Sequence, residues 1–230
     1  MKINWTMADL DINRYRAYLY IDLDYVIMNF FKTFRVNYYT TLLVNNVHPL
    51  DINYENIKTN NKIFKLFKSC ILDSTATFWN SIEISSVGNF YWKRLKDYQN
   101  RIYFITNTFT DEELKYKQDW LSNRLGIEGE KRLYNNINLE QFARSELYPN
   151  LLVSNDRIIC NKWIKLGGKS FWDLGKRSVS SYYIDEIKLQ LDLYYGIDLV
   201  AGIPEFKLKR RMKTDSTDIK SITADDLYLI

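Results

Sequence analysis

The chain has 230 residues, of which 46% are hydrophobic and 16% aromatic, so it can bury a substantial core and is not a disordered protein. Its 32 Lys and Arg residues against 28 Asp and Glu give a net charge of +4, which is too small to indicate nucleic-acid binding by itself. Two cysteines, Cys70 and Cys160, exclude a disulfide framework and lie outside any metal-ligand motif, so we expect free thiols in a reducing compartment.

The sequence predicts neither a signal peptide nor a membrane span. The first residues, MKINWTMADLDINRYR, have no apolar stretch after their charges, and no segment approaches the roughly 18 uninterrupted apolar residues of a spanning helix. Frequent Asn, Lys, Ile and Tyr, with only 8 Gly and 3 Pro, are typical of AT-rich coding sequence in a bacterium or a virus. We therefore expect a cytoplasmic protein, in the host cytoplasm if it is viral, with no membrane partner.

The first predicted element is a buried strand that ends in two carboxylates. The segment Ala17-Tyr-Leu-Tyr-Ile21 is short and apolar, and it runs directly into Asp22-Leu-Asp24. Two aspartates two positions apart, with a loop beginning between them, can take different roles at one site, one as a nucleophile and the other as a proton donor.

Residues 28 to 89 are predicted to form a mostly helical insertion. The pattern turns helical from about Val26 to Tyr39, and a later amphipathic segment places five residues on one face: Ile63, Phe64, Phe67, Cys70 and Ile71. Aromatic residues at helical spacing are more often core than ligand contacts, and Phe30 is the best candidate for an exception that stacks a base.

A strand followed by a helix then occurs twice. Arg101-Ile-Tyr-Phe-Ile105 predicts a strand ending in Thr106-Asn107, and a capping box at Thr110 starts a helix near Asp111, which ends at Gly126. Leu151-Leu-Val153 predicts a third strand, followed by Ser154-Asn-Asp156 and a helix that buries Ile159, Trp163 and Leu166 before Gly167-Gly168.

This alternation predicts an α/β fold with a parallel sheet, helices on both faces and a ligand crevice at the carboxyl ends of the strands. Asp22, Asp24, Thr106 and residues 154 to 156 all fall at that edge. A last helix, around Ser181 to Tyr195, is expected to pack on the sheet through Ile184, Ile187, Leu191 and Tyr194. The basic run Lys207-Leu-Lys-Arg-Arg-Met-Lys213 and the polar tail after it are expected to be a surface extension.

Several motifs in this order resemble the haloacid dehalogenase (HAD-like) superfamily of phosphatases. Tyr20-Ile-Asp22-Leu-Asp24 resembles its first motif and Phe104-Ile-Thr106-Asn107 its second. Phe78-Trp-Asn-Ser-Ile-Glu83, Lys115-Tyr-Lys-Gln-Asp-Trp-Leu121 and the segment from Trp163 to Gly168 look like the 5′(3′)-deoxyribonucleotidase branch, which includes phage members. The resemblance covers about residues 17 to 175.

The resemblance implies a three-layer Rossmann-like core with a parallel sheet and a helical cap inserted after the first strand. The core would comprise residues 1–27 and 90–200, the cap residues 28–89, and a C-terminal extension residues 201–230. By the same resemblance, Asp22 would be the nucleophile, Asp24 the general acid and base, and Thr106 and Asn107 phosphate ligands. Asp22, Asp24 and Asp156 would bind Mg²⁺.

The sequence departs from the family pattern at three places. Tyr25 stands where the family usually has Gly, so the loop after the second aspartate is expected to differ. Ser154 and Asn155 stand where the fourth motif has paired acids, and Asp156 serves as a metal ligand only if the loop shifts by one residue. The family's third-motif lysine is missing at its usual distance, with Arg144 as the nearest substitute and Lys131 as a more distant one.

Three functions are compatible with these residues. The first is a Mg²⁺-dependent phosphomonoesterase acting on a nucleotide through an aspartyl phosphate, as in a 5′-nucleotidase. The second is a catalytically degenerate HAD-like binding or structural protein, such as a phage-encoded or virion-associated one, which the altered fourth motif favours. The third is a nucleic-acid end phosphatase that uses residues 207 to 213, which would bind in a salt-sensitive way. The sequence leaves the base, the sugar and the oligomeric state open.

Overall fold

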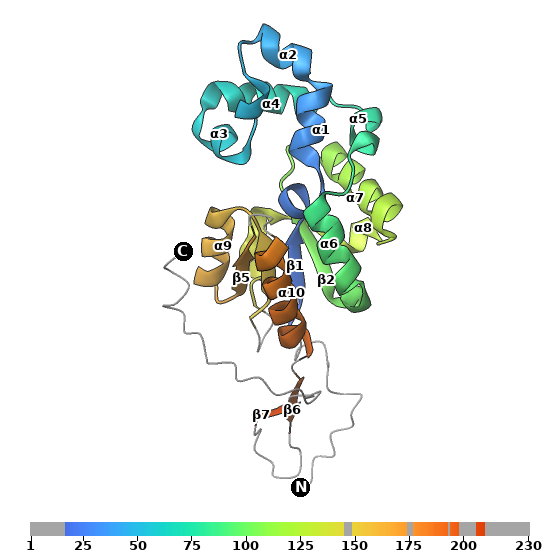
Figure 1. The fold of residues 1–230 in the computed structure, drawn as a ribbon, viewed down its shortest axis with the longest axis vertical. Coiled ribbons are helices and arrows are strands. Elements are labelled where there is room, and N and C mark those ends of the chain that lie inside the picture. Colours follow the sequence, from blue (N-terminus) through green and yellow to red (C-terminus); the bar gives the residue numbers. More distant parts are fainter. Residues whose placement is uncertain (1–16, 145–148, 174–176, 193, 198–205, 210–230) are drawn as a thin grey trace. The chain divides into compact units, whose positions relative to one another are not determined.

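The protein is described from a computed structural model that covers residues 17–144, 149–173, 177–192, 194–197 and 206–209. The chain divides into two compact units, Met1–Leu191 and Asp192–Ile230. In the first unit, five parallel strands form one sheet in the order β3-β2-β1-β4-β5 (Figure 1). The strands are β1 (Leu19–Asp22), β2 (Ile102–Thr106), β3 (Leu133–Asn135), β4 (Leu151–Ser154) and β5 (Lys169–Trp172).

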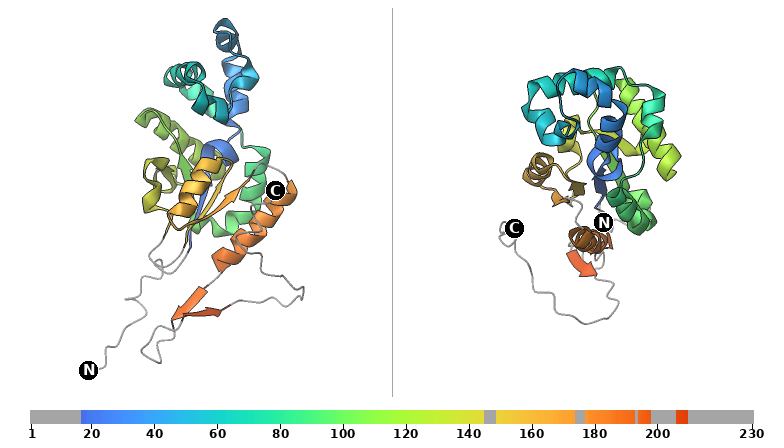
Figure 2. Two further views of the ribbon diagram at one scale, coloured as in Figure 1. Left: turned by 90° about the vertical axis from the view of Figure 1, so that its left-hand side faces the viewer. Right: turned by 45° about the horizontal axis from the view of Figure 1, so that its top comes forward.

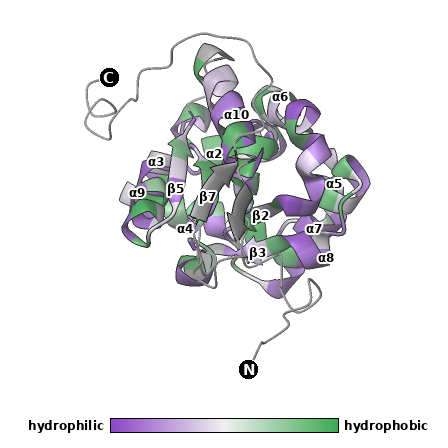
Figure 3. Cartoon of the chain, turned by 90° about the horizontal axis from the view of Figure 1, so that it is seen from below, coloured by the Kyte–Doolittle hydropathy of each residue, from purple (hydrophilic) through white to green (hydrophobic). Residues whose placement is uncertain are grey.

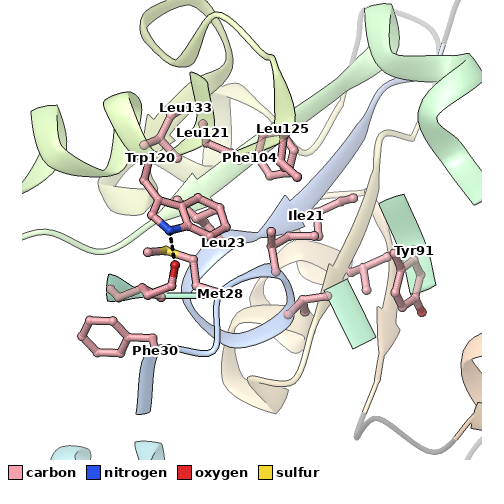
Figure 4. Close-up of a cluster of buried hydrophobic side chains, with 14 of the residues drawn as sticks. Ile21, Leu23, Met28, Phe30, Tyr91, Phe104, Trp120, Leu121, Leu125 and Leu133 are labelled. Atoms are coloured by element: carbon pink, nitrogen blue, oxygen red, sulfur yellow. Dashed lines mark hydrogen bonds between the residues drawn. The ribbon is translucent and has the colours of Figure 1, made fainter. Parts of the chain in front are cut away.

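Helices cover both faces of this sheet because alternate strand residues point to opposite sides. On one face, Ile21 and Phe104 join a core with α6 (Ser86–Leu95), α7 (Asp111–Leu125) and α10 (Arg177–Asp192), part of which Figure 4 shows. On the other face, Tyr20 and Leu152 pack with Trp163 of α9 (Arg157–Lys165) and with Leu139 of the 3-10 turn η5 (Asn136–Gln141). The predicted three-layer α/β fold with a parallel sheet is therefore confirmed.

The chain between β1 and β2 is almost entirely helical, as predicted for the cap. Figures 1 and 2 show α1 to α4 beyond the end of the sheet at which β1 finishes. The predicted boundary at residue 89 falls inside α6, whose Tyr91 and Leu95 belong to the core of the sheet. The elements of this insertion before α6 are η2 (Leu23–Ile27), α1 (Phe30–Asn37), α2 (Tyr39–Val44), η3 (Pro49–Asp51), α3 (Tyr54–Thr59), α4 (Asn61–Leu72) and α5 (Ala76–Ser81), and η4 (Lys96–Arg101) follows it.

Aromatic side chains make the interior of the cap. Phe30 packs with five other rings at centroid distances of 5.5 to 6.3 Å: Phe31, Phe34, Phe67, Phe78 and Trp79. The predicted amphipathic helix is α4, and four of its five inner residues are buried. The prediction for Phe64 was wrong, because this ring is 37% exposed and faces Phe109.

The two strand-and-helix predictions are confirmed, except that Leu166 follows the end of α9 and is half-buried. The Thr110 hydroxyl accepts a hydrogen bond from the Glu113 N–H at 3.1 Å and so caps α7, which ends at Gly126 with a φ of 68°. Helix α9 buries Ile159 and Trp163, and Gly167 follows it with a φ of 88°. The strands β3 and β5 were not predicted, because the short segments Leu133–Asn135 and Lys169–Trp172 are only partly buried and lack the apolar run of β1.

Helix α10 (Arg177–Asp192) begins and ends earlier in the chain than predicted. It ends at Asp192, and Tyr194 belongs instead to β6 (Tyr194–Ile197), which pairs antiparallel with β7 (Phe206–Lys209) in the second unit. Only residues 207 to 209 of the basic run are described, so the rest of that run and the polar tail lie outside the described residues.

Two of the helices beside the sheet have largely polar surfaces. Figure 3 shows α7 and α8 (Gly129–Arg132) largely in hydrophilic colours, which agrees with the buried stripe of α7 being narrow. Within the described part of the chain, no helix is both long and apolar enough to cross a membrane.

Candidate active site at the carboxyl end of the sheet

The two carboxylates at the end of β1 are brought together by a single π-helical turn. Asp22 is the last residue of the strand, and its Oδ1 accepts a hydrogen bond from the Tyr25 N–H at 3.3 Å. The Met28 N–H donates to the Leu23 carbonyl at 2.8 Å and closes the turn η2. Both carboxylates are buried, and Asp24 lies close enough for its charge to act on Asp22.

The polar end of β2 holds Asp24. The Thr106 hydroxyl donates to Asp24 Oδ2 at 2.7 Å, and the Asn107 N–H donates to the same oxygen at 3.3 Å. This contact follows from the sheet, because β2 pairs with β1 in a register that sets Ile105 beside Asp22. The structure therefore brings Asp22, Asp24, Thr106 and Asn107 to one place.

A lysine that the sequence analysis did not single out lies at the centre of this site. Lys117 is buried on α7, and its Nζ lies 2.9 Å from Asp24 Oδ1 and 2.8 Å from Glu113 Oε1. The contact with Asp24 is an ion pair without hydrogen-bond geometry. Lys117 also donates to the Thr106 hydroxyl at 2.9 Å and to the Asn107 carbonyl at 2.8 Å.

Lys117 stays charged despite its burial. Burial alone would lower its pKa, but Asp24 and Glu113 outweigh that effect and raise the pKa above its ordinary value. The sequence signal was present: Glu113 and Lys117 are an i,i+4 acid-base pair in the helix that follows Thr106.

The two basic residues that were considered as substitutes for the family lysine lie elsewhere. Arg144 is exposed, and its side chain lies against Gly167, in the loop that leads into the amino end of β5. Lys131 is exposed on α8 and pairs with Glu128. The structure does not bring either residue to the carboxylates.

Ser154 connects Asp22 to the segment after β4. Its hydroxyl donates to Asp22 Oδ2 at 2.6 Å and accepts a hydrogen bond from the Asp156 N–H at 3.0 Å. Asp156 is buried, caps α9 by accepting from the Ile158 N–H at 2.9 Å, and pairs with Lys58 of α3 at 3.0 Å. Asn155 instead donates from its amide to the Tyr25 carbonyl at 3.3 Å.

The electrostatics of the site disfavour ionised Asp22. Burial is the main cause, the charge of Asp24 adds to it, and together they raise the pKa of Asp22 to about 8 although the Ser154 hydroxyl acts in the opposite direction. Burial also raises the pKa of Asp156. A positive charge close to Asp22 would therefore favour its ionised form.

Tyr25 lies in the π-helical turn after the second aspartate. Among the described residues, the non-glycine with a positive φ is Asn46, so Tyr25 keeps an ordinary backbone within the π-helical turn. Its ring stacks on Phe31 at 5.4 Å between centroids. The turn therefore does not need a glycine at position 25.

Phe30 lies behind Lys117. The Nζ of this lysine is 5.7 Å from the Phe30 ring centroid and 5.5 Å from that of Trp79. Phe30 is buried among other cap rings, so in this arrangement it forms part of the wall of the site.

The donor set suits a hard cation. No three His, Cys, Asp or Glu side chains in the described segments converge as a ready-made metal cage. Magnesium, however, is commonly held by one or two carboxylates together with water and substrate phosphate. Asp22 and Asp156 are buried, and burial raises the pKa of each carboxyl. The charge of Asp156 also raises the pKa of Asp22, so the two carboxylates are close enough to share such an ion.

Comparisons with known proteins give one structural likeness. No family model and no curated protein matches the chain. A solved haloacid dehalogenase-like hydrolase from Streptococcus pneumoniae is similar, with 11% sequence identity and a TM-score of 0.48, over 74% of this chain and 91% of that one.

Proposed function

We propose that the protein is a phosphomonoesterase of the HAD type that acts on a nucleotide, as the resemblance to the deoxyribonucleotidase branch and its phage members implies. One observation carries the proposal. Asp22 at the end of β1 and Asp24 in the π-helical turn after it lie at the carboxyl end of the sheet, where Thr106 and Lys117 contact Asp24. Phosphoryl transfer needs a nucleophile, a proton carrier and fixed positive charge, and this site offers each of them.

In the proposed reaction, a carboxylate oxygen of Asp22 attacks the phosphorus atom of the substrate. The bond from phosphorus to the leaving oxygen breaks, and that oxygen receives a proton from Asp24, whose carboxylate takes up the proton that Asp22 gives up when it ionises for the attack. Water then gives its proton to Asp24 and attacks the phosphorus atom of the aspartyl phosphate, which restores Asp22 and releases inorganic phosphate. Thr106, the Asn107 N–H and Lys117 would hold the phosphate oxygens.

Magnesium, when bound, would neutralise phosphate charge and favour ionised Asp22. Asp22 and Asp156 are the residues that we propose to hold it. Asp24 is better placed for proton transfer than for metal binding, because its oxygens already face Thr106, Asn107 and Lys117.

A nucleotide is the proposed substrate because two partly exposed aromatic rings border the site. Phe109 follows Thr106 closely, is 38% exposed and donates its N–H to Glu113, the partner of Lys117. Phe64 of the cap lies 6.0 Å from it between ring centroids, and Lys68 Nζ lies 5.5 Å from the Phe109 ring. Exposed rings beside a phosphate site are suited to stack a base.

The test is phosphate release from a panel of nucleoside monophosphates in the presence of Mg²⁺. Wild-type protein should release phosphate, and Asp22→Asn should abolish the release, because an amide cannot form the aspartyl phosphate. Asp51→Asn changes an exposed aspartate of the cap and serves as the matched control, which should keep full activity. Equal rates for Asp22→Asn and wild type would contradict the proposal.

A second candidate function is a binding or structural role without catalysis. A specific observation favours it: each carboxylate already has a partner from the protein, with Lys117 on Asp24, Lys58 on Asp156 and Ser154 on Asp22. In that case no nucleotide would be turned over, and calorimetry would detect no Mg²⁺ binding.

A further inference from the structure

An ion pair joins the cap to the core directly beside the proposed metal ligands. Lys58 lies on α3 of the cap, and its Nζ is 3.0 Å from Asp156 Oδ2. The Lys58 side chain is 34% exposed, whereas that of Asp156 is 1% exposed. Asp22 lies close enough to Lys58 for their charges to interact. The cap therefore places a positive charge near the carboxylates of both Asp22 and Asp156.

The two carboxylate oxygens of Asp156 have different partners in the structure. Its Oδ1 accepts the N–H of Ile158 and caps α9, a role that fixes the carboxylate at the end of β4. Its Oδ2 is the atom that Lys58 contacts. A metal ion that binds Asp156 through Oδ2, the oxygen that does not accept the Ile158 N–H, would therefore meet the Lys58 ammonium there.

We propose that Lys58 and a divalent cation compete for Asp156 Oδ2, so that binding of the cation releases the Lys58 latch between cap and core. This proposal rests on the metal site proposed above. Two cations on one carboxylate oxygen would repel each other strongly in a partly buried site. The divalent ion would win at sufficient concentration, because Asp22 also gains from its charge.

The exchange would couple the metal to the motion of the cap. Lys58 is in the short helix Tyr54–Thr59, which packs against α4 of the cap. With Asp156 occupied by the metal, this helix would lose its ion pair with the core, and the ammonium would become available to the phosphate of a substrate. Without metal, the latch would hold the cap over the site.

Calorimetry with MgCl2 on metal-stripped protein, in the absence of substrate, tests the competition. Lys58→Met removes the charge and keeps the aliphatic stem, and it should bind Mg²⁺ about fivefold or more tightly than wild type, even allowing for solvent screening of a partly exposed charge. Lys58→Arg keeps the charge and should bind like wild type or more weakly. Lys62→Met, an exposed lysine on α4, is the matched control and should leave the affinity unchanged. Equal or weaker binding by Lys58→Met would overturn the proposal.

Amide hydrogen exchange gives a second readout that does not depend on activity. Mg²⁺ should speed exchange in residues 54 to 59 of wild type, and metal-free Lys58→Met should already show the faster exchange. Unchanged exchange in wild type on adding Mg²⁺ would overturn the latch.

Each of the two proposals can be rejected independently of the other. Tighter Mg²⁺ binding by Lys58→Met without phosphate release from any substrate would support the competition between Lys58 and the cation and reject the phosphatase activity. Phosphate release that requires Asp22, together with equal Mg²⁺ affinity in Lys58→Met, would reject only the competition between Lys58 and the cation. A wild-type protein that binds no Mg²⁺ would also contradict this competition.

Discussion

Asp22 is held in a site that stabilises its protonated form. Its pKa is raised to about 8 from an ordinary value of 3.8, mainly by burial and then by the charge of Asp24. Between these two values the folded protein keeps a proton that the unfolded chain gives up, so this group makes folding less favourable as the pH rises. The cost comes from burying a carboxyl group beside another carboxylate.

We predict that Asp22→Asn stabilises the metal-free protein, and that the gain increases with pH. The asparagine does not titrate, whereas wild type loses stability from about pH 4 to about pH 8. The gain should grow by at least about 1 kcal/mol over that range, since one pKa unit is worth about 1.4 kcal/mol. Urea unfolding of both proteins across this range measures it, and a gain that does not depend on pH would contradict the assigned environment of Asp22.

Lys117 is expected to be the most costly single residue of the site to remove. Lys117→Met leaves Asp24 and Glu113 buried without their cation, and breaking a buried ion pair in this way costs about 3 to 5 kcal/mol. Lys115→Met, at an exposed position of the same helix, should change the free energy of unfolding by less than about 0.5 kcal/mol. Similar losses from the two substitutions in denaturant unfolding would show that Lys117 is not buried as described.

At the scale of elements, the π-helical turn is clamped by the start of α6. The Ser85 N–H donates to the Ile27 carbonyl at 2.7 Å, and the Ser85 hydroxyl donates to the Val26 carbonyl at 2.5 Å. A Cβ on Gly88 would lie 2.6 Å from both the Cα and the carbonyl oxygen of Ile27. Gly88 therefore allows the helix to touch the turn that positions Asp24.

Gly88→Ala should destabilise the protein and displace the turn. Overpacking against backbone costs about 1 to 3 kcal/mol, which more than offsets the gain in helix propensity. Phosphate release should fall as well, because Asp24 moves with the turn. Asn89→Ala, at an exposed position of the same helix, should be neutral or stabilising. Thermal unfolding and activity of the two variants decide this, and an unimpaired Gly88→Ala would contradict the tight packing.

The elements that could be predicted from sequence are those with strong local signals. Apolar runs predicted the strands β1, β2 and β4. The Thr110 cap predicted the start of α7, and glycines predicted the ends of α7 and α9. The short strands β3 and β5 could not be predicted, because their pairing partners and not their own residues decide their conformation. Phe64 shows a similar limit, because its contact with Phe109, a ring distant in the sequence, could not be predicted from the helical spacing within α4.

At the scale of the whole molecule, binding of Mg²⁺ should stabilise the folded protein. Any ligand that binds only the folded state adds free energy, about 2.7 kcal/mol at a hundred times its dissociation constant. We expect Mg²⁺ to raise the melting temperature of wild type and chelator to reverse the rise. Asp22→Asn and Asp156→Asn should show a smaller rise. An equal rise in all three proteins would mean that the ion binds elsewhere.

The site could be predicted only in part, because it is assembled from distant segments. The ordered motifs placed Asp22, Asp24 and Thr106 at neighbouring strand ends, and parallel pairing of β1 with β2 then brings them together. Lys117 and Lys58 reach the site from helices, where the direction of a side chain depends on tertiary packing. Arg144 was considered because it precedes β4 in sequence, but the chain before a parallel strand enters at the opposite end of the sheet from the site.

A crystal structure with Mg²⁺ and beryllium trifluoride, a mimic of the phosphoryl group, tests the central claim most directly. We predict the fluoride complex bonded to a carboxylate oxygen of Asp22, with its fluorines facing Thr106 and Lys117 and the metal ion between Asp22 and Asp156. Well-ordered crystals in which Asp22 stays unmodified, or in which the complex attaches to another residue, would contradict the account.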